Sequence, residues 1–174
     1  LHYRAFPINV GLIRATRADG AGNLTMEREG LIGEVLPIAQ AVRNHGGLVI
    51  AQVEEITDGP AAPHAVRVPG MLIDALVIAE PGQHDQTFAE SFNASYVEAG
   101  GRVAPAPMPF SERKIIARRV LREIGAGSIV NLGIGMPEGV VPVAAEEGRL
   151  DEFTLTLESG PIGGMPAGGL SFGC

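Results

Sequence analysis

The order of apolar and polar positions predicts a strand, a turn and a helix in the first part of the chain. Residues 8–16 (INVGLIRAT) have the alternation of a strand, and residues 17–25 have the Asp, Gly and Asn content of a turn. Residues 31–47 carry apolar side chains at helical spacing and end on two glycines. Because Pro37 lacks a backbone donor, we expect the regular helix to start near it or to kink there.

Two later runs complete an α/β pattern. Residues 48–56 and 71–80 are mostly apolar and rich in β-branched side chains, which predicts strands buried on both faces of a mainly parallel sheet. A strand, a helix and a strand in that order predict an α/β fold. Residues 81–109 have weak periodicity and four prolines, so we expect two domains, 1–108 and 109–174, joined through this segment.

A second helix is predicted over residues 111–127. Ser111 is suited to cap its start, and Gly125 is suited to stop it. An apolar stripe with a spacing of four residues is formed by Ile116, Val120 and Ile124. The other faces carry the basic side chains of Lys114, Arg118, Arg119 and Arg122, which either form a solvated helix face or contact phosphate groups.

Glycine is concentrated near the end of the chain, where 12 of the 24 glycines fall within the last fifty residues. Residues 128–160 predict a strand, a glycine loop, a helix and a strand. The first glycine loop, residues 133–139 (GIGMPEG), opens the helix at Pro137, and free amides at such a start suit an anion. Neither a repeat nor a low-complexity segment explains the glycines, so close approach of the backbone to a ligand is a hypothesis.

Glu158 ends the next strand and is followed by a second glycine loop, residues 160–173, with six glycines and two prolines. One interpretation is a dinucleotide-binding unit, with a GxGxxxG loop and an acid 25 residues after Gly133. The late third glycine, the negative charge of Glu138 and the second loop itself weaken that interpretation.

A second interpretation makes Glu158 a nucleophile toward an activated electrophile such as a thioester, with loop amides stabilising the oxyanion. A third holds that the glycines only permit positive φ and that Glu158 is solvated. The residues alone leave all three open.

Composition narrows the class of partner. A net charge of −7 argues against a nucleic-acid partner, since a phosphate backbone requires clustered Lys and Arg. No apolar run approaches the roughly 20 residues of a membrane span, so we expect no membrane partner and a cytoplasmic setting. Cys174 is the only cysteine and the four histidines are scattered, so we expect no disulfide and no metal site. We also expect an internal fragment of a longer chain, since it lacks an initial Met and closes inside a glycine loop.

Three segments of the second half resemble the family I CoA-transferases, and among these the single-chain acetate/propionate type. They are PMPFSERKIIARRV (107–120), IVNLGIGMPEGV (129–140) and TLESGPIGGMPAGGLSFG (156–173). In the first half, LIRATRADGAGNLTME (12–27) and GGLVIAQVEEI (46–56) are similar to the closing part of the family's first domain. The resemblance implies an α/β CoA-transferase fold of open sheets flanked by helices. It makes 1–108 the end of the first domain with the interdomain segment, and 109–174 the start of the second.

The resemblance also implies a function. A family member transfers CoA between a short-chain acyl-CoA and a carboxylic acid, of the acetate or propionate type, by a ping-pong route through a glutamyl-CoA thioester. The nucleophile would be Glu158. The substrate and CoA would be bound by the first-loop residues Gly133, Ile134, Gly135 and Pro137 and the second-loop residues Ser159, Gly160, Gly163, Gly164, Gly168 and Gly169.

The family implies coenzyme A as a substrate, no bound cofactor, no metal, and a homo-oligomer at full length. Family members continue beyond these residues, so this chain could be inactive alone. An acyl-CoA hydrolase of the same fold, an NAD-binding module and a non-catalytic fragment remain as alternatives.

Overall fold

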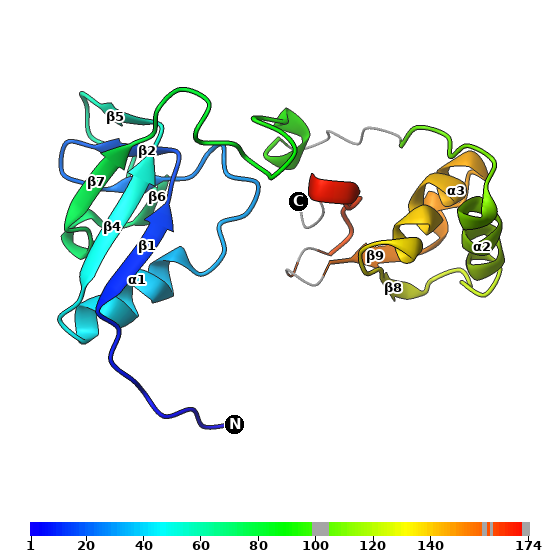
Figure 1. The fold of residues 1–174 in the computed structure, drawn as a ribbon, viewed down its shortest axis with the longest axis horizontal. Coiled ribbons are helices and arrows are strands. Elements are labelled where there is room, and N and C mark those ends of the chain that lie inside the picture. Colours follow the sequence, from blue (N-terminus) through cyan, green and yellow to red (C-terminus); the bar gives the residue numbers. More distant parts are fainter. Residues whose placement is uncertain (99–104, 158–159, 161, 172–174) are drawn as a thin grey trace. The chain divides into compact units, whose positions relative to one another are not determined.

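The computed structural model describes residues 1–98, 105–157, 160 and 162–171. The chain divides into two compact units, whose elements are labelled in Figure 1. Unit 1 comprises Leu1–Gln86 and Glu90–Val97, and unit 2 comprises Thr87–Ala89 and Glu98–Cys174. The prediction that these parts correspond to two CoA-transferase domains, meeting at residue 108, stays a prediction.

Unit 1 is an α/β unit with two small sheets. Its strands are β1 (Val10–Arg14), β2 (Arg17–Asp19), β3 (Leu24–Thr25), β4 (Leu48–Val53), β5 (Glu55–Thr57), β6 (Val66–Val68) and β7 (Ala75–Ile78). Its helices are α1 (Val35–Asn44) and the short 3-10 helices η1 (Gly70–Leu72) and η2 (Ala94–Tyr96). One sheet has the order β1-β4-β7 with all strands parallel, and the other is a mixed sheet of order β5-β2-β3-β6. The predicted α/β fold is therefore confirmed for this unit.

Pro37 lies in the first turn of helix α1, where a proline is tolerated. Pro37 is the third residue of the helix, within the first turn, where the backbone N–H has no partner inside the helix. The helix ends at Asn44, and Gly46 follows with a φ of +70°, a conformation that favours glycine. The expectation that the regular helix starts near Pro37 is confirmed.

The hairpin after β1 differs from the sequence prediction. Residues 17–25 were expected to form only a turn, but β2 and β3 pair antiparallel within this range. The Gly and Asn residues occupy the connection between these two strands, and Asp19 is the last residue of β2. The prediction located the turn residues and missed the two short strands around them.

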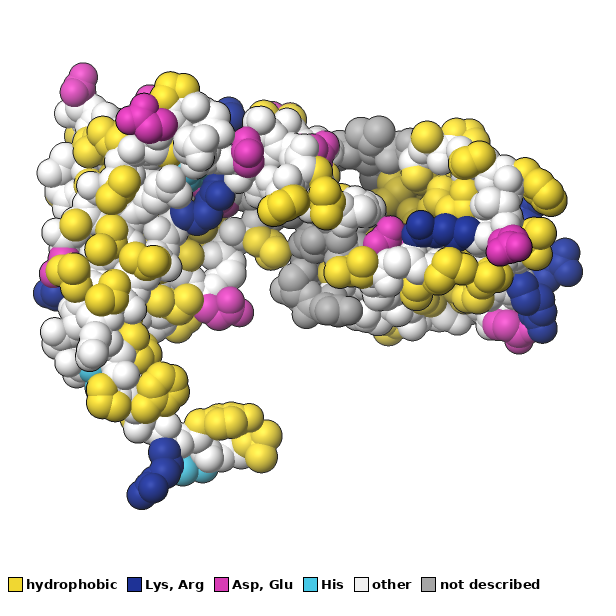
Figure 2. Space-filling model, in the orientation of Figure 1, with side chains coloured by type: hydrophobic (Ala, Val, Ile, Leu, Met, Phe, Trp, Pro, Cys, Tyr) yellow, Lys and Arg dark blue, Asp and Glu magenta, His cyan; other side chains and the backbone are white. Residues whose placement is uncertain are grey.

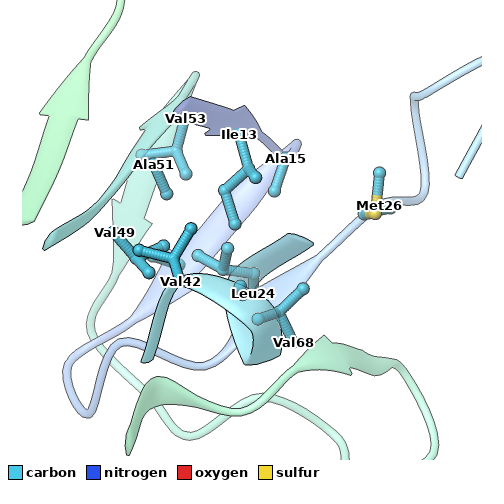
Figure 3. Packing of buried hydrophobic residues seen from close by; sticks show 11 residues of the cluster. Ile13, Ala15, Leu24, Met26, Val42, Val49, Ala51, Val53 and Val68 are labelled. Atoms are coloured by element: carbon cyan, nitrogen blue, oxygen red, sulfur yellow. The ribbon is translucent and has the colours of Figure 1, made fainter. Parts of the chain in front are cut away.

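The core of unit 1 lies between α1 and the strands, where the labelled side chains in Figure 3 converge, apart from Met26, which lies to one side. Its fully buried members include Val42 of α1, Val49 of β4 and Leu24 of β3. Val42 lies so close to β1 that a Cβ added at Gly11 would come within 2.7 Å of its Cγ2 atom. The glycine therefore allows the helix to pack tightly on the strand.

The structure contradicts the prediction that residues 48–56 and 71–80, which contain β4 and β7, are buried on both faces of the sheet. On one face of the sheet, Leu12 is 75% exposed and Val77 is 48% exposed, and β7 has no buried residue. Figure 2 shows hydrophobic side chains gathered over these strands. The apolar runs predicted two covered faces, but within the described residues α1 supplies a layer on one face only.

Unit 2 places two parallel strands beside two helices. Its elements are α2 (Glu112–Leu121), β8 (Ile129–Asn131), η3 (Met136–Gly139), α3 (Val140–Glu146), η4 (Leu150–Glu152), β9 (Thr154–Thr156) and η5 (Gly169–Ser171). Strands β8 and β9 are parallel, and η3 and α3 form the crossover between them. The predicted order of strand, glycine loop, helix and strand is confirmed.

Helix α2 is capped as predicted but buries a different face. The Ser111 hydroxyl accepts a hydrogen bond from the Lys114 amide at 3.3 Å. The buried residues are Ala117 and Leu121, whereas Ile116 is 45% exposed. The apolar stripe with a spacing of four residues therefore did not identify the buried face. The buried residues, Ala117 and Leu121, each follow a residue of the stripe by one position, because that face packs against α3.

Candidate active site

The two glycine loops leave the sheet of unit 2 from the same edge. Asn131 and Thr156 are paired in the parallel register of β8 and β9, and the Asn131 Nδ2 atom donates to Thr156 Oγ1 at 3.1 Å. Each strand ends at this pair, and a glycine loop follows each of them. The carboxyl ends of neighbouring parallel strands are where α/β proteins bind ligands. The structure therefore brings the two predicted loops together at the carboxyl ends of β8 and β9, where a ligand-binding site is expected.

In the first loop, the predicted residues Gly133, Ile134, Gly135 and Pro137 lie between β8 and the helix that follows. Ile134 is 68% exposed, and Pro137 is the second residue of η3. Gly135 precedes η3 with φ +93° and ψ −123°, a conformation that side-chain-bearing residues rarely adopt. Backbone geometry alone thus accounts for glycine at position 135.

Glu138 organises the first loop, and sequence reasoning gave it no such role. Its Oε1 atom accepts a hydrogen bond from the Gly135 N–H at 2.8 Å. Its Oε2 atom lies 3.2 Å from Nη2 of Arg113 on α2, and the same Nη2 donates to the Gly135 carbonyl. A glutamate at the third position of a helix, reaching back to the residue before it, is half of a capping box and could have been recognised from the sequence. The Gly135 amide is thus occupied by a side chain and not free for an anion.

The second loop turns back along β9. The Gly160 N–H donates to the Leu157 carbonyl at 3.0 Å, and the Gly163 N–H donates to the Leu155 carbonyl at 2.8 Å. Ile162 forms an antiparallel bridge with Thr156. The predicted nucleophile Glu158 and the predicted binding residue Ser159 lie outside the described residues, between Leu157 and Gly160.

The glycines of the second loop fall into two groups. Gly160, Gly163 and Gly169 have φ values of +111°, +83° and +63°, so their backbone conformation favours glycine. Gly164 and Gly168 do not have a positive φ. Among the described residues, a Cβ at Gly164 would meet nothing within 4 Å, and one at Gly168 would meet only Glu138 Oε2 at 3.8 Å. The described structure therefore gives no internal reason for glycine at positions 164 and 168.

Two cavities border the second loop within unit 2. One, of about 200 Å³, is lined by Gly163, Gly164 and Met165 together with residues of η4 and β9. The other, of about 270 Å³, has Arg113 and Glu138 on its wall and is otherwise largely apolar, with Leu132, Pro166 and Gly168 among its lining residues. Both loops thus contribute to the second cavity.

The basic side chains of α2 are mostly engaged with carboxylates. Lys114 Nζ lies 2.7 Å from Glu146 Oε2, and Arg118 lies 3.3 Å from Glu147. Hydrogen bonding from Lys114 lowers the pKa of Glu146, and the Met108 amide and Arg118 act in the same direction. Arg119 pairs with Glu123. These pairings favour a structural role over a phosphate-binding surface. Arg118 and Arg119 are exposed to solvent, whereas the Lys114 side chain is only 13% exposed.

Two further observations bear on the kinds of site present. Within the described ranges, none of the helices has the length and apolar character needed to cross a bilayer. In the same part of the chain, no three His, Cys, Asp or Glu side chains are grouped so that they could hold a metal ion.

Comparison with known proteins finds relatives that are all named as CoA-transferases. The chain is 39% identical over 181 residues to a caffeate CoA-transferase of Acetobacterium woodii, covering 99% of this chain and 34% of the relative. It is 37% identical over 177 residues to the acetate CoA-transferase YdiF of Escherichia coli, covering 99% of this chain and 33% of the relative. No family model matches the chain.

The chain is a homologue of the family I CoA-transferases and has their α/β fold. It is similar to the crystal structure of an acyl-CoA transferase, YdiF, from E. coli O157:H7, described as a thioester complex with CoA. The TM-score is 0.79 at 37% identity, over 98% of this chain and 34% of that one. The apoenzyme of the same protein gives a TM-score of 0.78 at 39% identity, over 93% of this chain and 31% of that one. The chain spans about a third of the length of the curated relatives that it matches.

Proposed function

We propose that a protein carrying these residues transfers coenzyme A between a short-chain acyl-CoA and a carboxylic acid through a glutamyl-CoA thioester on Glu158. The observation that carries the proposal is the similarity to CoA-transferases over 99% of the chain. The relative solved as a thioester complex with CoA supports the thioester route. The two glycine loops both follow the carboxyl ends of β8 and β9, which is a physical reason to propose the active site there.

The proposed route has four attacks on carbonyl groups, two in each half of the transfer. A Glu158 oxygen attacks the thioester carbonyl of the acyl-CoA, the C–S bond breaks, and an acyl-glutamyl anhydride and a CoA thiolate form. The thiolate then attacks the glutamyl carbonyl of the anhydride, the C–O bond to the acyl group breaks, and the first acid leaves as its carboxylate. The carboxylate of a second acid attacks the glutamyl-CoA thioester, and the same steps run in reverse. Electrons and atoms balance without an added reductant or oxidant.

The glycine loops have a defined task in this proposal. Each attack places negative charge on a carbonyl oxygen, and backbone N–H groups fixed near that oxygen stabilise it. We propose that Gly133, Ile134, Gly135 and Pro137 lie near the thioester, and that Ser159, Gly160, Gly163, Gly164, Gly168 and Gly169 line the acyl side. The two glycines that the described structure does not need, Gly164 and Gly168, are the positions where a substrate could approach the backbone most closely.

A steady-state assay tests the proposal against its alternatives. In the complete gene product that carries this chain, acetyl-CoA and propionate should give propionyl-CoA and acetate with ping-pong kinetics. CoA turnover should require the added acid. Release of free CoA at the same rate without any added acid would indicate a hydrolase instead, because water would then resolve the thioester. Binding of NAD, with no exchange of CoA, would support the dinucleotide module.

Two parts of the proposal extend the family's properties to this protein. Coenzyme A acts as a substrate with no bound cofactor, and the full-length protein forms a homo-oligomer. Size-exclusion chromatography with light scattering of the complete gene product measures the second. A monomeric mass at micromolar concentration would remove the oligomer from the proposal without affecting the chemistry.

A further inference from the structure

Glu138 is in contact with both glycine loops. Its Oε1 atom accepts from the Gly135 N–H of the first loop at 2.8 Å, and its Oε2 atom accepts from the Gly169 N–H of the second loop at 3.4 Å. These two glycines are 34 residues apart in the sequence. A simple helix cap would need only the first bond. The carboxylate therefore links the two loops as well as closing the start of η3.

Arg113 completes the arrangement from a third element, α2. Its Nη2 group lies 3.2 Å from Glu138 Oε2 and also donates to the carbonyl of Gly135. The peptide groups of Gly135 are thus held on the N–H side by Glu138 and on the carbonyl side by Arg113. Gly135 needs such support because its backbone conformation, at φ +93° and ψ −123°, is sparsely populated.

Because the Glu138 side chain is largely buried, its hydrogen bonds and its ion pair with Arg113 are stronger than the same contacts would be on the protein surface. The Glu138 side chain is only 15% exposed, and it forms part of the wall of the cavity of about 270 Å³ that Leu132 and Gly168 also line. Hydrogen bonds to an ionised group in a partly desolvated site are stronger than those between neutral groups. A largely buried carboxylate that bonds both loops at once fixes their separation.

We infer that Glu138, supported by Arg113, is a positioning residue that sets the relative placement of the two glycine loops for the CoA-transfer reaction. This inference rests on the function proposed above, in which the loops carry the amides that stabilise the oxyanion. Glu138 acts through Gly135 and Gly169 and has no covalent part in the reaction. Its carboxylate accepts from both amides and pairs with Arg113.

The test measures loop structure and catalysis separately, in the complete gene product. Glu138→Ala should accelerate amide hydrogen exchange in peptides covering residues 132–137 and residues 163–171 by about tenfold or more, because both amides lose their acceptor. Glu138→Gln keeps one oxygen acceptor and replaces the other oxygen with an NH2 donor. Only one of the two loops can then keep its bond to residue 138, so exchange should accelerate mainly at the other loop. The kcat for CoA transfer should fall by about 10- to 100-fold in Glu138→Ala. The KM for acyl-CoA should change less than kcat.

Glu147→Gln is the matched control. Glu147 directly follows α3, pairs with Arg118 at 3.3 Å, and its side chain is 37% exposed. The same loss of charge there should leave exchange in both loops and kcat unchanged. If Glu138→Ala fails to fold, Glu138→Gln and Arg113→Gln provide the measurement, since each removes only part of the arrangement.

Three results are decisive. Unchanged exchange in both loops would overturn the inference. Faster exchange at residues 132–137 alone in Glu138→Ala would overturn it too, since Glu138 would then be a local cap. If the wild-type gene product transfers no CoA, the proposed function fails, whereas faster exchange in both loops of Glu138→Ala would still establish the link between them.

Discussion

Asp19 organises the connection between β2 and β3 through its carboxylate. The carboxylate accepts hydrogen bonds from the backbone N–H groups of Ala61 at 3.0 Å and of Asn23 and Ala21 at 2.9 Å each. The Asn23 Nδ2 group adds a further bond at 2.9 Å. The hydrogen bond from the Ala61 amide, followed by those from Asn23, lowers the pKa of Asp19 to about 2. The ionised carboxylate thus joins the hairpin to the segment after β5.

The lowered pKa of Asp19 predicts how the stability of unit 1 depends on pH. Because the folded pKa, about 2, is below the ordinary value of 3.8, the stabilisation is fully present above pH 3.8 and is lost as the pH falls through 2. Chemical denaturation of wild type and Asp19→Asn should therefore show a constant difference in unfolding free energy at neutral pH, which shrinks below pH 3.8.

Asp58→Asn is the control for this measurement, because Asp58 is an exposed aspartate of the same unit. Its difference from wild type should stay small at every pH. A wild-type to Asp19→Asn difference that is the same at pH 7 and at pH 2 would contradict the assigned role of the Asp19 carboxylate.

Gly164 allows a direct test of close substrate approach. Since an added Cβ would meet nothing within 4 Å among the described residues and φ is not positive, Gly164→Ala should change the free energy of unfolding by less than about 0.5 kcal/mol. If a substrate lies against this backbone, the added methyl group displaces it and kcat/KM should fall by about 10- to 100-fold. Thermal unfolding and the transfer assay measure the two effects.

Gly59→Ala is the matched substitution, because Gly59 also lacks a positive φ and its added Cβ also meets nothing within 4 Å in the described structure. It should leave both stability and kcat/KM unchanged. Full activity in Gly164→Ala would remove the close-approach explanation for that glycine.

At the scale of elements, α2 is held to unit 2 by one face. Ala117 and Leu121 are buried against α3 and the β8-β9 strands, with Val140, Val143 and Leu155 in the same cluster. Leu121→Ala should therefore lower the free energy of unfolding by about 2–5 kcal/mol, because a buried leucine leaves a cavity. Ile116→Ala, on the 45% exposed face, should cost less than about 1 kcal/mol. Equal losses for the two variants in a denaturation series would show that both faces are packed.

Local patterns predicted most elements and missed features that depend on packing. Pro37 and the cap at Ser111 were predictable, because each depends on backbone chemistry within one turn. The buried face of α2 was not, since Ile116 and Ala117 are adjacent and only the position of α3 decides which is covered. Likewise, strand composition predicted two covered faces for β7 where one is exposed.

The candidate site was predictable as two loops but not as a connected structure. Glycine content and strand order placed both loops at strand ends, which the β8-β9 register confirms. The link from Glu138 to Gly169 was beyond sequence reasoning, because it depends on how the second loop folds back along β9. The assignment of Glu158 as the nucleophile stays a prediction that came from family resemblance.

At the scale of the whole molecule, the described residues form two separate hydrophobic cores, one in each unit. The cluster around Val42 and Leu24 belongs to unit 1, and the cluster around Leu121 and Val143 belongs to unit 2. The described parts of both proposed glycine loops lie in unit 2. The similarity to CoA-transferases extends over both units. The proposed reaction is therefore assigned to a protein that contains unit 1 as well as the glycine loops of unit 2.

In the proposed mechanism, Glu158 carries CoA as a thioester during transfer. The most direct measurement is to incubate the complete gene product with an acyl-CoA, reduce it with borohydride, and map the modified peptide by mass spectrometry. Borohydride converts a glutamyl thioester into a primary alcohol, so we expect this change at Glu158 and expect it to be absent without acyl-CoA. Glu158→Gln should lose both the label and the transfer activity. Reduction at another residue, or transfer activity that survives in Glu158→Gln, would contradict the account.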